Sequence, residues 1–173
     1  MRILQIIDSL EIGGAERMAV NYANALSKKI EFSGIVVTRK EGDLRNKIEL
    51  GSSYFFLNRK SKIDIKAVLK LKKICTKNKI THLQAHSSSF FIAFLTKLFL
   101  PKIKIIWHDH NGLSEFISTQ KSYVLKFVSL FFSGIVVVND KLKNGQKKSL
   151  IVIMLFICLI LHPLRMRSIV VRF

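Results

Sequence analysis

Acidic residues and cysteines are scarce in this sequence. Only 11 of its 173 residues are Asp or Glu, against 29 Lys and Arg, which gives a formal net charge of +18 at pH 7. Such a charge favours anionic partners, namely nucleic acid, an acidic membrane surface or phosphorylated substrates. The two cysteines, Cys75 and Cys158, belong to no CxxC motif or Cys/His cluster. Neither a zinc site nor a disulfide framework is therefore indicated, and a reducing, cytoplasmic setting is expected.

A signal peptide is not expected at the amino terminus. The amino-terminal apolar run is short, Asp8 interrupts it, and no small-residue cleavage site follows. Hydrophobic residues nevertheless make up 49% of the chain, which is enough to build a core. The length suits a single domain.

Short apolar runs alternate with helical patterns along most of the chain. Strands are expected at residues 3–7, 34–38, 54–57, 81–86, 102–108 and 134–139. Helices are expected directly after Gly14 and over residues 62–79, 87–100 and 123–132. The first helix should turn one face inward, made of Ala15, Met18, Ala19, Tyr22, Ala25 and Leu26. This alternation predicts an α/β fold, a Rossmann-like, mostly parallel sheet with helices on both faces.

Parallel sheets of this kind bind ligands beyond the carboxyl ends of their strands. Gly13, His86, His108 and Asn139 all fall at such ends in the predicted arrangement. Their convergence predicts a cleft at that edge of the sheet.

The glycine pair Gly13-Gly14 follows the first strand. Glycines at the start of a helix let backbone N–H groups approach a diphosphate, although a tight turn between strand and helix explains them equally well. The pair is not the GxGxxG dinucleotide fingerprint, because the third glycine is missing. A nucleotide-dependent oxidoreductase is disfavoured for this reason, and because Thr38 and Arg39 stand where an acidic ribose ligand is expected.

Two polar clusters follow later strands. The first cluster spans Gln84 to Ser89, and in it His86 and Ser87 are candidates to line the cleft. The N-cap of the following helix is expected at Ser87 or Ser88. Ser88 and Ser89 are expected only to cap that helix. The second is Trp107-His108-Asp109-His110-Asn111-Gly112. An imidazole there can hydrogen-bond sugar hydroxyls or carry a proton, and His108 is the candidate catalytic residue. No metal site is expected, because adjacent His-Asp-His side chains do not converge easily on one ion.

The stretch from Arg59 to Lys79 is rich in lysine. Its first interpretation is a solvated helix face, and its second is attraction to anionic lipid headgroups. Nucleic-acid binding lacks support, because no aromatic residues are interleaved with these charges.

Four segments together resemble the amino-terminal domain of family 4-type retaining glycosyltransferases of the GT-B fold. They are IIDSLEIGGAERMAVNYANAL, QAHSSSF, IIWHDHNG and GIVVVNDKLK, in that order over residues 1–143. The second segment usually has histidine where Gln84 stands. The resemblance implies sugar transfer from a nucleotide-sugar donor to a polysaccharide or lipid-linked acceptor, without a further cofactor.

The resemblance also implies roles for individual residues. Gly13 and Gly14 would lie near the donor phosphates, and His108 would contact the transferred sugar. His86, Ser87, Asp109, His110 and Asn139 would line the acceptor side of the cleft. The donor base and ribose would be held by a second domain that is not recognisable in this sequence, so the chain alone is expected to be inactive.

The tail from Asn144 no longer resembles the family. Residues 149–173 contain no acidic residue, and the apolar stretch 150–161 is short for a membrane span. Codons for this tail can be chosen so that a neighbouring frame reads KSYCNNVIYLPNFA, which resembles the family's interdomain linker. A single-base deletion near codon 144 is the preferred interpretation, with residues 144–173 out of frame after a domain of residues 1–143. A small basic membrane-surface protein with a real hydrophobic anchor is the alternative.

Overall fold

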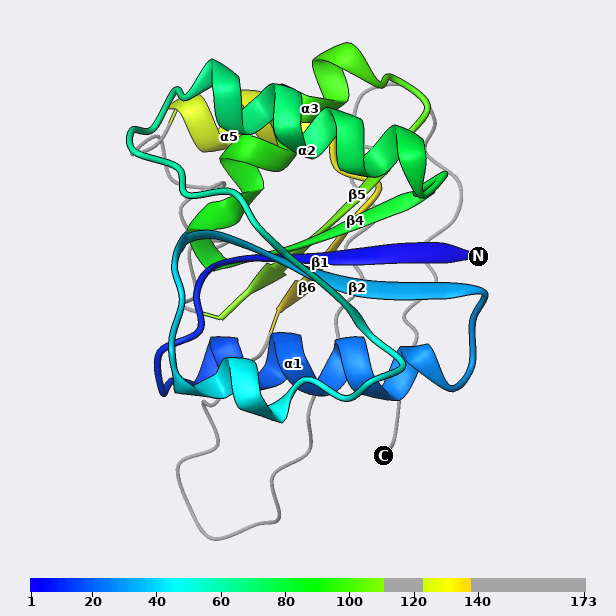
Figure 1. Ribbon diagram of the computed structural model, residues 1–173. Helices are drawn as coiled ribbons and strands as arrows, with labels where there is room; N and C mark the ends of the chain where they lie inside the picture. Colours follow the sequence, from blue (N-terminus) through cyan, green and yellow to red (C-terminus); the bar gives the residue numbers. More distant parts are fainter. Residues whose placement is uncertain (111–122, 138–173) are drawn as a thin grey trace, which may run out of the picture.

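The computed structural model describes residues 1–110 and 123–137. Their centre is a six-stranded sheet in which all neighbouring strands are parallel, in the order β3-β2-β1-β4-β5-β6 (Figure 1). The strands are β1 (Arg2–Ser9), β2 (Phe32–Lys40), β3 (Ser53–Phe56), β4 (His82–His86), β5 (Lys104–Asp109) and β6 (Gly134–Val137). The predicted α/β, Rossmann-like fold is confirmed. Asn139 and the tail 144–173 lie outside the described residues.

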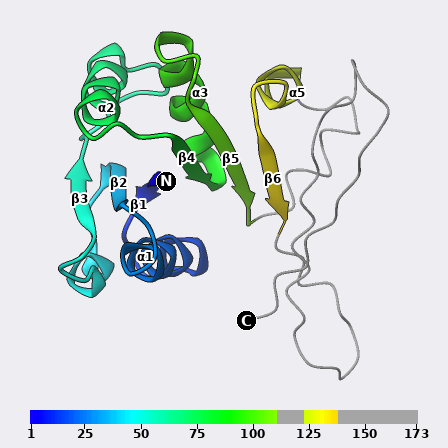
Figure 2. The ribbon, with the colours of Figure 1, turned by 90° about the vertical axis from the view of Figure 1, so that its right-hand side faces the viewer.

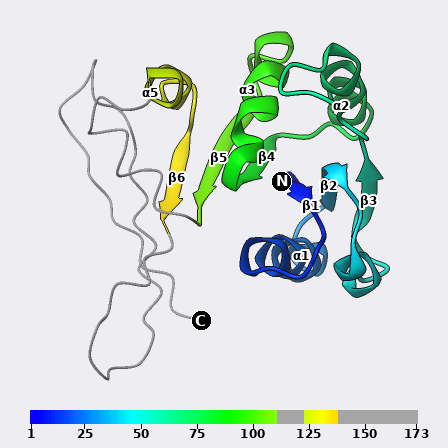
Figure 3. The same cartoon turned by 90° about the vertical axis from the view of Figure 1, so that its left-hand side faces the viewer.

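Helices cover both faces of the sheet, as Figures 2 and 3 show from opposite sides. On one face lie α1 (Gly14–Ser27) and the 3-10 turn η1 (Asp43–Lys47). On the other lie α2 (Ile65–Lys77), α3 (Phe90–Phe99) and α5 (Tyr123–Ser129). A further 3-10 turn, η2 (Ser87–Ser89), leads into α3.

Two hydrophobic cores follow from the alternation of side chains along the strands. In β1, Leu4 and Ile6 belong to the core under α2 and α3, which also holds Trp107. Ile7 belongs to the smaller core under α1. Gln5, which shares the α1 side with Ile7, belongs to neither core although it is fully buried. A polar layer therefore lies between the sheet and α1.

The buried face of α1 is narrower than predicted. Its buried residues are Ala19, Val20 and Ala23, whereas Ala25 is exposed, so the expected inward position of Ala25 is wrong. Tyr22 is only partly buried. The helix lies along β1 and β2 and contacts them through a stripe of small side chains, which leaves the far end of the predicted face in solvent.

Among residues 1–110 and 123–137, no helix combines the length and the apolar character needed to cross a membrane.

Candidate ligand site at the carboxyl edge of the sheet

The strand order reverses between β1 and β4. From β1 the chain adds β2 and β3 on one side, and from β4 it adds β5 and β6 on the other. The carboxyl ends flanking such a reversal form the crevice in which open α/β sheets bind ligands. Asp8 stands next to the end of β1 and His86 ends β4, so both residues border this crevice.

Three histidines meet at this edge. His86 of β4 pairs in register with His108 of β5, and His110 follows β5 directly. The ring centroids of His86 lie 4.9 Å from His108 and 5.2 Å from His110. The sequence argument that His-Asp-His side chains diverge was wrong for the two histidines, because residues two apart on a strand point to the same face. Tyr22 of α1 closes the cluster, with its ring edge-on to His108 at 5.1 Å.

The histidines belong to one continuous chain of hydrogen bonds. His110 Nε2 lies 2.9 Å from His86 Nδ1, and His86 Nε2 lies 2.8 Å from Gln5 Oε1. Gln5 Nε2 donates to Gln84 Oε1 at 3.0 Å, and Gln84 Nε2 contacts His108 Nε2. The chain stops there, because His108 Nδ1 is buried and has no hydrogen-bond partner within the described residues. An unpaired buried polar atom of this kind is costly unless a ligand satisfies it.

Burial keeps these imidazoles neutral. Desolvation lowers the pKa of His86 well below its ordinary value, and the positive charges of His108 and His110 would lower it further. Burial, assisted by His110, lowers the pKa of His108 to about 3. Burial also lowers the pKa of His110, although the carboxylates of Asp109 and Glu16 oppose the shift. The cluster is therefore uncharged at neutral pH.

Acidification is expected to destabilise the domain through His108. The unfolded state binds a proton below about pH 6.5, whereas the folded state resists it down to about pH 3. The contribution of His108 to the free energy of unfolding is thus fully present above pH 6.5. It decreases as the pH falls, by about 2 kcal/mol at pH 5. Urea unfolding between pH 7.5 and 5 measures the loss. The variant His108→Gln should show a flatter pH profile, and identical profiles would contradict the prediction.

Among the residues that the structure describes, these three histidines form a group that could hold a metal ion. Each offers one ring nitrogen, and these nitrogens lie within 4.8 Å of one another. Zn²⁺ ligands in proteins lie about 2 Å from the ion, so the rings would have to move closer to bind one. The expectation that the chain has no metal site stays a prediction.

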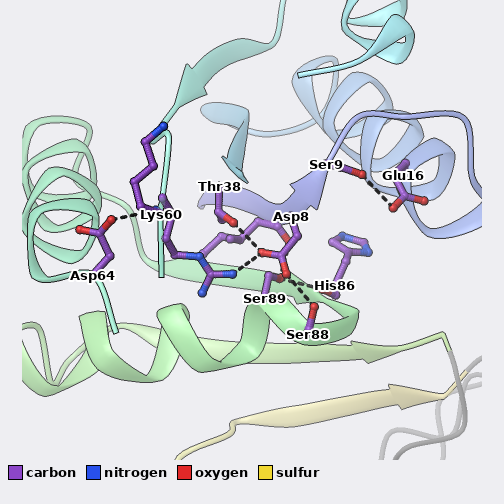
Figure 4. Close-up of polar contacts among 11 residues, drawn as sticks. Asp8, Ser9, Glu16, Thr38, Lys60, Asp64, His86, Ser88 and Ser89 are labelled. Atoms are coloured by element: carbon purple, nitrogen blue, oxygen red, sulfur yellow. Dashed lines mark hydrogen bonds and ion pairs between the residues drawn. The ribbon is translucent and has the colours of Figure 1, made fainter. Parts of the chain in front are cut away.

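A second polar cluster surrounds Asp8 at the same edge of the sheet (Figure 4). Asp8 accepts hydrogen bonds from Thr38 at 2.5 Å and from Ser88 at 2.6 Å. It also forms an ion pair with Arg59 at 2.8 Å, whose side chain is only 3% exposed. Burial lowers the pKa of Arg59, and the charge of Asp8 opposes that shift. Sequence reasoning missed this cluster, because it grouped Arg59 with a solvated lysine-rich face.

Ser89 occupies the N-cap position of α3, but its side chain makes no capping hydrogen bond. Ser88 binds Asp8, while Ser89 donates to the backbone oxygens of Ile6 and His86 at 2.7 Å. The expected N-cap at Ser87 or Ser88 is therefore wrong, because Ser89 holds that position. The serines instead tie β4 to β1 across the crevice. Ser87 adopts a positive φ of 50°, and its carbonyl oxygen accepts from Trp107 Nε1 at 2.8 Å.

The glycine pair lies where the sequence predicted it. Gly13 occupies the N-cap of α1 and Gly14 begins the helix, and neither has a positive φ. A Cβ atom at Gly14 would meet nothing within 4 Å, and one at Gly13 would meet only the side chain of Glu16. The described fold therefore does not itself require glycine at either position. This leaves room for a ligand near the backbone N–H groups, once the Glu16 carboxylate moves aside.

Not all candidates join the histidine cluster. Asp109 lies between His108 and His110 on β5, so its side chain points to the other face of the sheet, and it is fully buried. Gly13 and Gly14 stand at the start of α1, and Ser87 directly follows His86 in the sequence.

A protein-family model described as Glycosyltransferase Family 4 matches residues 12–147, which is most of the chain. The matched segment contains the glycine pair, both polar strand ends and all three clustered histidines. No curated protein matches the chain.

Proposed function

Because the chain belongs to glycosyltransferase family 4, we propose that it forms the acceptor-side half of an enzyme that transfers a sugar from a nucleotide-sugar donor to a polysaccharide or lipid-linked acceptor. The observation that carries this proposal is the unpaired Nδ1 of buried His108 at the carboxyl edge of the sheet. A sugar hydroxyl is a ligand that would satisfy it.

Most candidate residues have a role in this proposal. His108 contacts the transferred sugar, and His86 and His110 border the acceptor side of the cleft with Ser87. The backbone N–H groups at Gly13 and Gly14 face the donor phosphates, where the positive end of the α1 dipole favours an anion. Asn139 would join them from beyond the described residues. Asp109 is buried on the other face of the sheet, outside the histidine cluster.

The chain is proposed to bind its ligands without turning them over. The donor base and ribose would require a second domain, which we place downstream of a single-base deletion near codon 144. The test compares the purified 173-residue chain with the two-domain enzyme obtained by restoring the reading frame, using common nucleotide sugars. Transfer by the restored enzyme alone is expected. Turnover by the short chain would contradict the half-enzyme proposal, and no transfer by the restored enzyme would contradict the proposed function.

Association with an anionic membrane surface is a second proposal, which places the protein at the cytoplasmic face of the inner membrane. It is supported by α2, where Ile65 and Leu69 are exposed at 55% and 46% although both are large and apolar. Exposed lysines surround them, and Lys72 lies over the ring of Phe99 at 5.7 Å. Apolar groups among lysines can insert between lipid headgroups while the charges attract anionic lipids.

Vesicle flotation tests this second proposal. The chain should float with vesicles containing anionic phospholipid and remain behind with neutral ones. Lys66→Glu with Lys73→Glu on α2 should abolish flotation, whereas the matched pair Lys29→Glu and Lys47→Glu, near the other face of the sheet, should not. Equal loss in both double variants would show only a general effect of net charge.

A further inference from the structure

Gln5 and Gln84 connect His86 to His108 through a series of hydrogen bonds. Both amides are buried, and together they span from His86 Nε2 to His108 Nε2. An amide NH₂ group can only donate and an amide oxygen can only accept. The donor and acceptor in one hydrogen bond of the series therefore determine the donor and acceptor in the next.

In the observed orientation of the two amides, the series assigns the protons on the two rings. The oxygen of Gln5 faces His86 Nε2, so this nitrogen must carry a proton and Nδ1 must be bare. The NH₂ group of Gln84 faces His108 Nε2, so this nitrogen must be bare and Nδ1 must carry the proton. Reversing both amides would exchange the two rings, but it would still leave them in opposite tautomers.

We propose that Gln5 and Gln84 are positioning residues that hold His86 and His108 in opposite tautomers, with a proton on the otherwise unpaired Nδ1 of His108. The bare Nδ1 of His86 is the matching acceptor, presently shared with His110 Nε2 at 2.9 Å. A hydroxyl group both donates and accepts, so it could accept the proton of His108 Nδ1. The use of this proton to recognise a sugar hydroxyl rests on the proposed function.

The same arrangement disfavours a metal ion. A histidine binds a metal through a bare ring nitrogen, and its other nitrogen usually donates to an oxygen. His86 meets this condition through Gln5, whereas His108 offers the cluster a nitrogen that carries a proton. The geometric proximity of three nitrogens therefore does not make a metal site while Gln84 keeps its amide.

Nitrogen NMR of the ¹⁵N-labelled 173-residue chain tests the proposal without any substitution. Protonated and bare imidazole nitrogens have well-separated chemical shifts, so the tautomer of each ring can be read directly. His108 is expected to carry its proton on Nδ1 and His86 on Nε2. Any other pair of tautomers overturns the proposal.

The variant Gln84→Glu provides a second test. A carboxylate accepts from both sides, so the proton of His108 should move to Nε2 while His86 stays unchanged. Both Nδ1 atoms would then be bare, and affinity for Co²⁺, followed by its visible absorption, should rise about 10- to 100-fold. Gln84→Met, which has a similar size but no amide, no longer fixes the His108 tautomer, so its Co²⁺ affinity should lie between those of the unsubstituted chain and Gln84→Glu. Unchanged Co²⁺ affinity together with an unmoved proton in Gln84→Glu would overturn the proposal.

Gln5→Glu tests whether the effect passes along the series. Gln5 is bonded to His86 and Gln84 rather than to His108. Its carboxylate should turn the Gln84 amide around, so that the oxygen of Gln84 faces His108 and moves the proton there to Nε2. These measurements concern the resting chain and need no sugar transfer, so their failure is distinguishable from failure of the proposed function.

Discussion

Replacing His108 by alanine in the two-domain enzyme is expected to lower kcat/KM by about 100- to 1,000-fold, the usual effect of removing one preorganised donor from a reacting group. The expectation follows from the unpaired Nδ1 of His108, whose ring contacts Gln84 through Nε2 and packs against the ring of Tyr22. Steady-state kinetics with a saturating acceptor measure the change. The loss should fall mainly on kcat, because the contact is proposed to strengthen in the transition state.

His82→Ala is the matched control for this substitution. His82 begins β4, at the opposite end of the strand from His86, and it contacts Thr81 rather than the cluster. Its removal should leave kcat/KM within about twofold. A loss in His108→Ala no larger than in His82→Ala would remove His108 from the proposed mechanism.

Trp107→Ala is expected to lower the free energy of unfolding by about 3–5 kcal/mol, a large share of the stability of a small domain. Trp107 is fully buried, and its ring contacts Phe90 at 5.4 Å and Phe132 at 5.7 Å between centroids. Its Nε1 also donates to the carbonyl oxygen of Ser87. Urea unfolding of the 173-residue chain at pH 7.5 measures the effect.

The variant Trp107→Phe separates packing from the hydrogen bond. A phenylalanine retains most of the apolar contact but leaves the oxygen of Ser87 without its donor, so a loss of about 1–2 kcal/mol is expected. A Trp107→Ala variant that unfolds within 1 kcal/mol of the unsubstituted chain would show that the ring is not the centre of this core.

The sheet could be predicted from the sequence because each strand contains a short, mainly apolar run bounded by polar or glycine-containing segments. The run ILQII at residues 3–7 already marks β1, and IIWH marks β5. The family resemblance pointed to His108 in the same way, and its position at a strand end is where the sequence placed it. Local patterns therefore gave the elements and their order.

The contents of the site could not be predicted in the same way, because they depend on register between distant strands. Gln5 and Gln84 are 79 residues apart, and only the pairing of β1 with β4 brings their amides together. Arg59 stands among exposed lysines in the sequence, yet it is buried against Asp8. The serines after β4 were assigned to a helix cap from local preference, whereas tertiary bonds to Asp8 and Ile6 decide their positions.

The amide pair makes the effects of substitutions at positions 5 and 84 non-additive, because each side chain depends on the other for a hydrogen bond. Neutral histidine also has one donor and one acceptor. A Gln84→His substitution can therefore preserve the order of donors and acceptors that begins at Gln5. A leucine at either position would leave the other amide buried with an unsatisfied end.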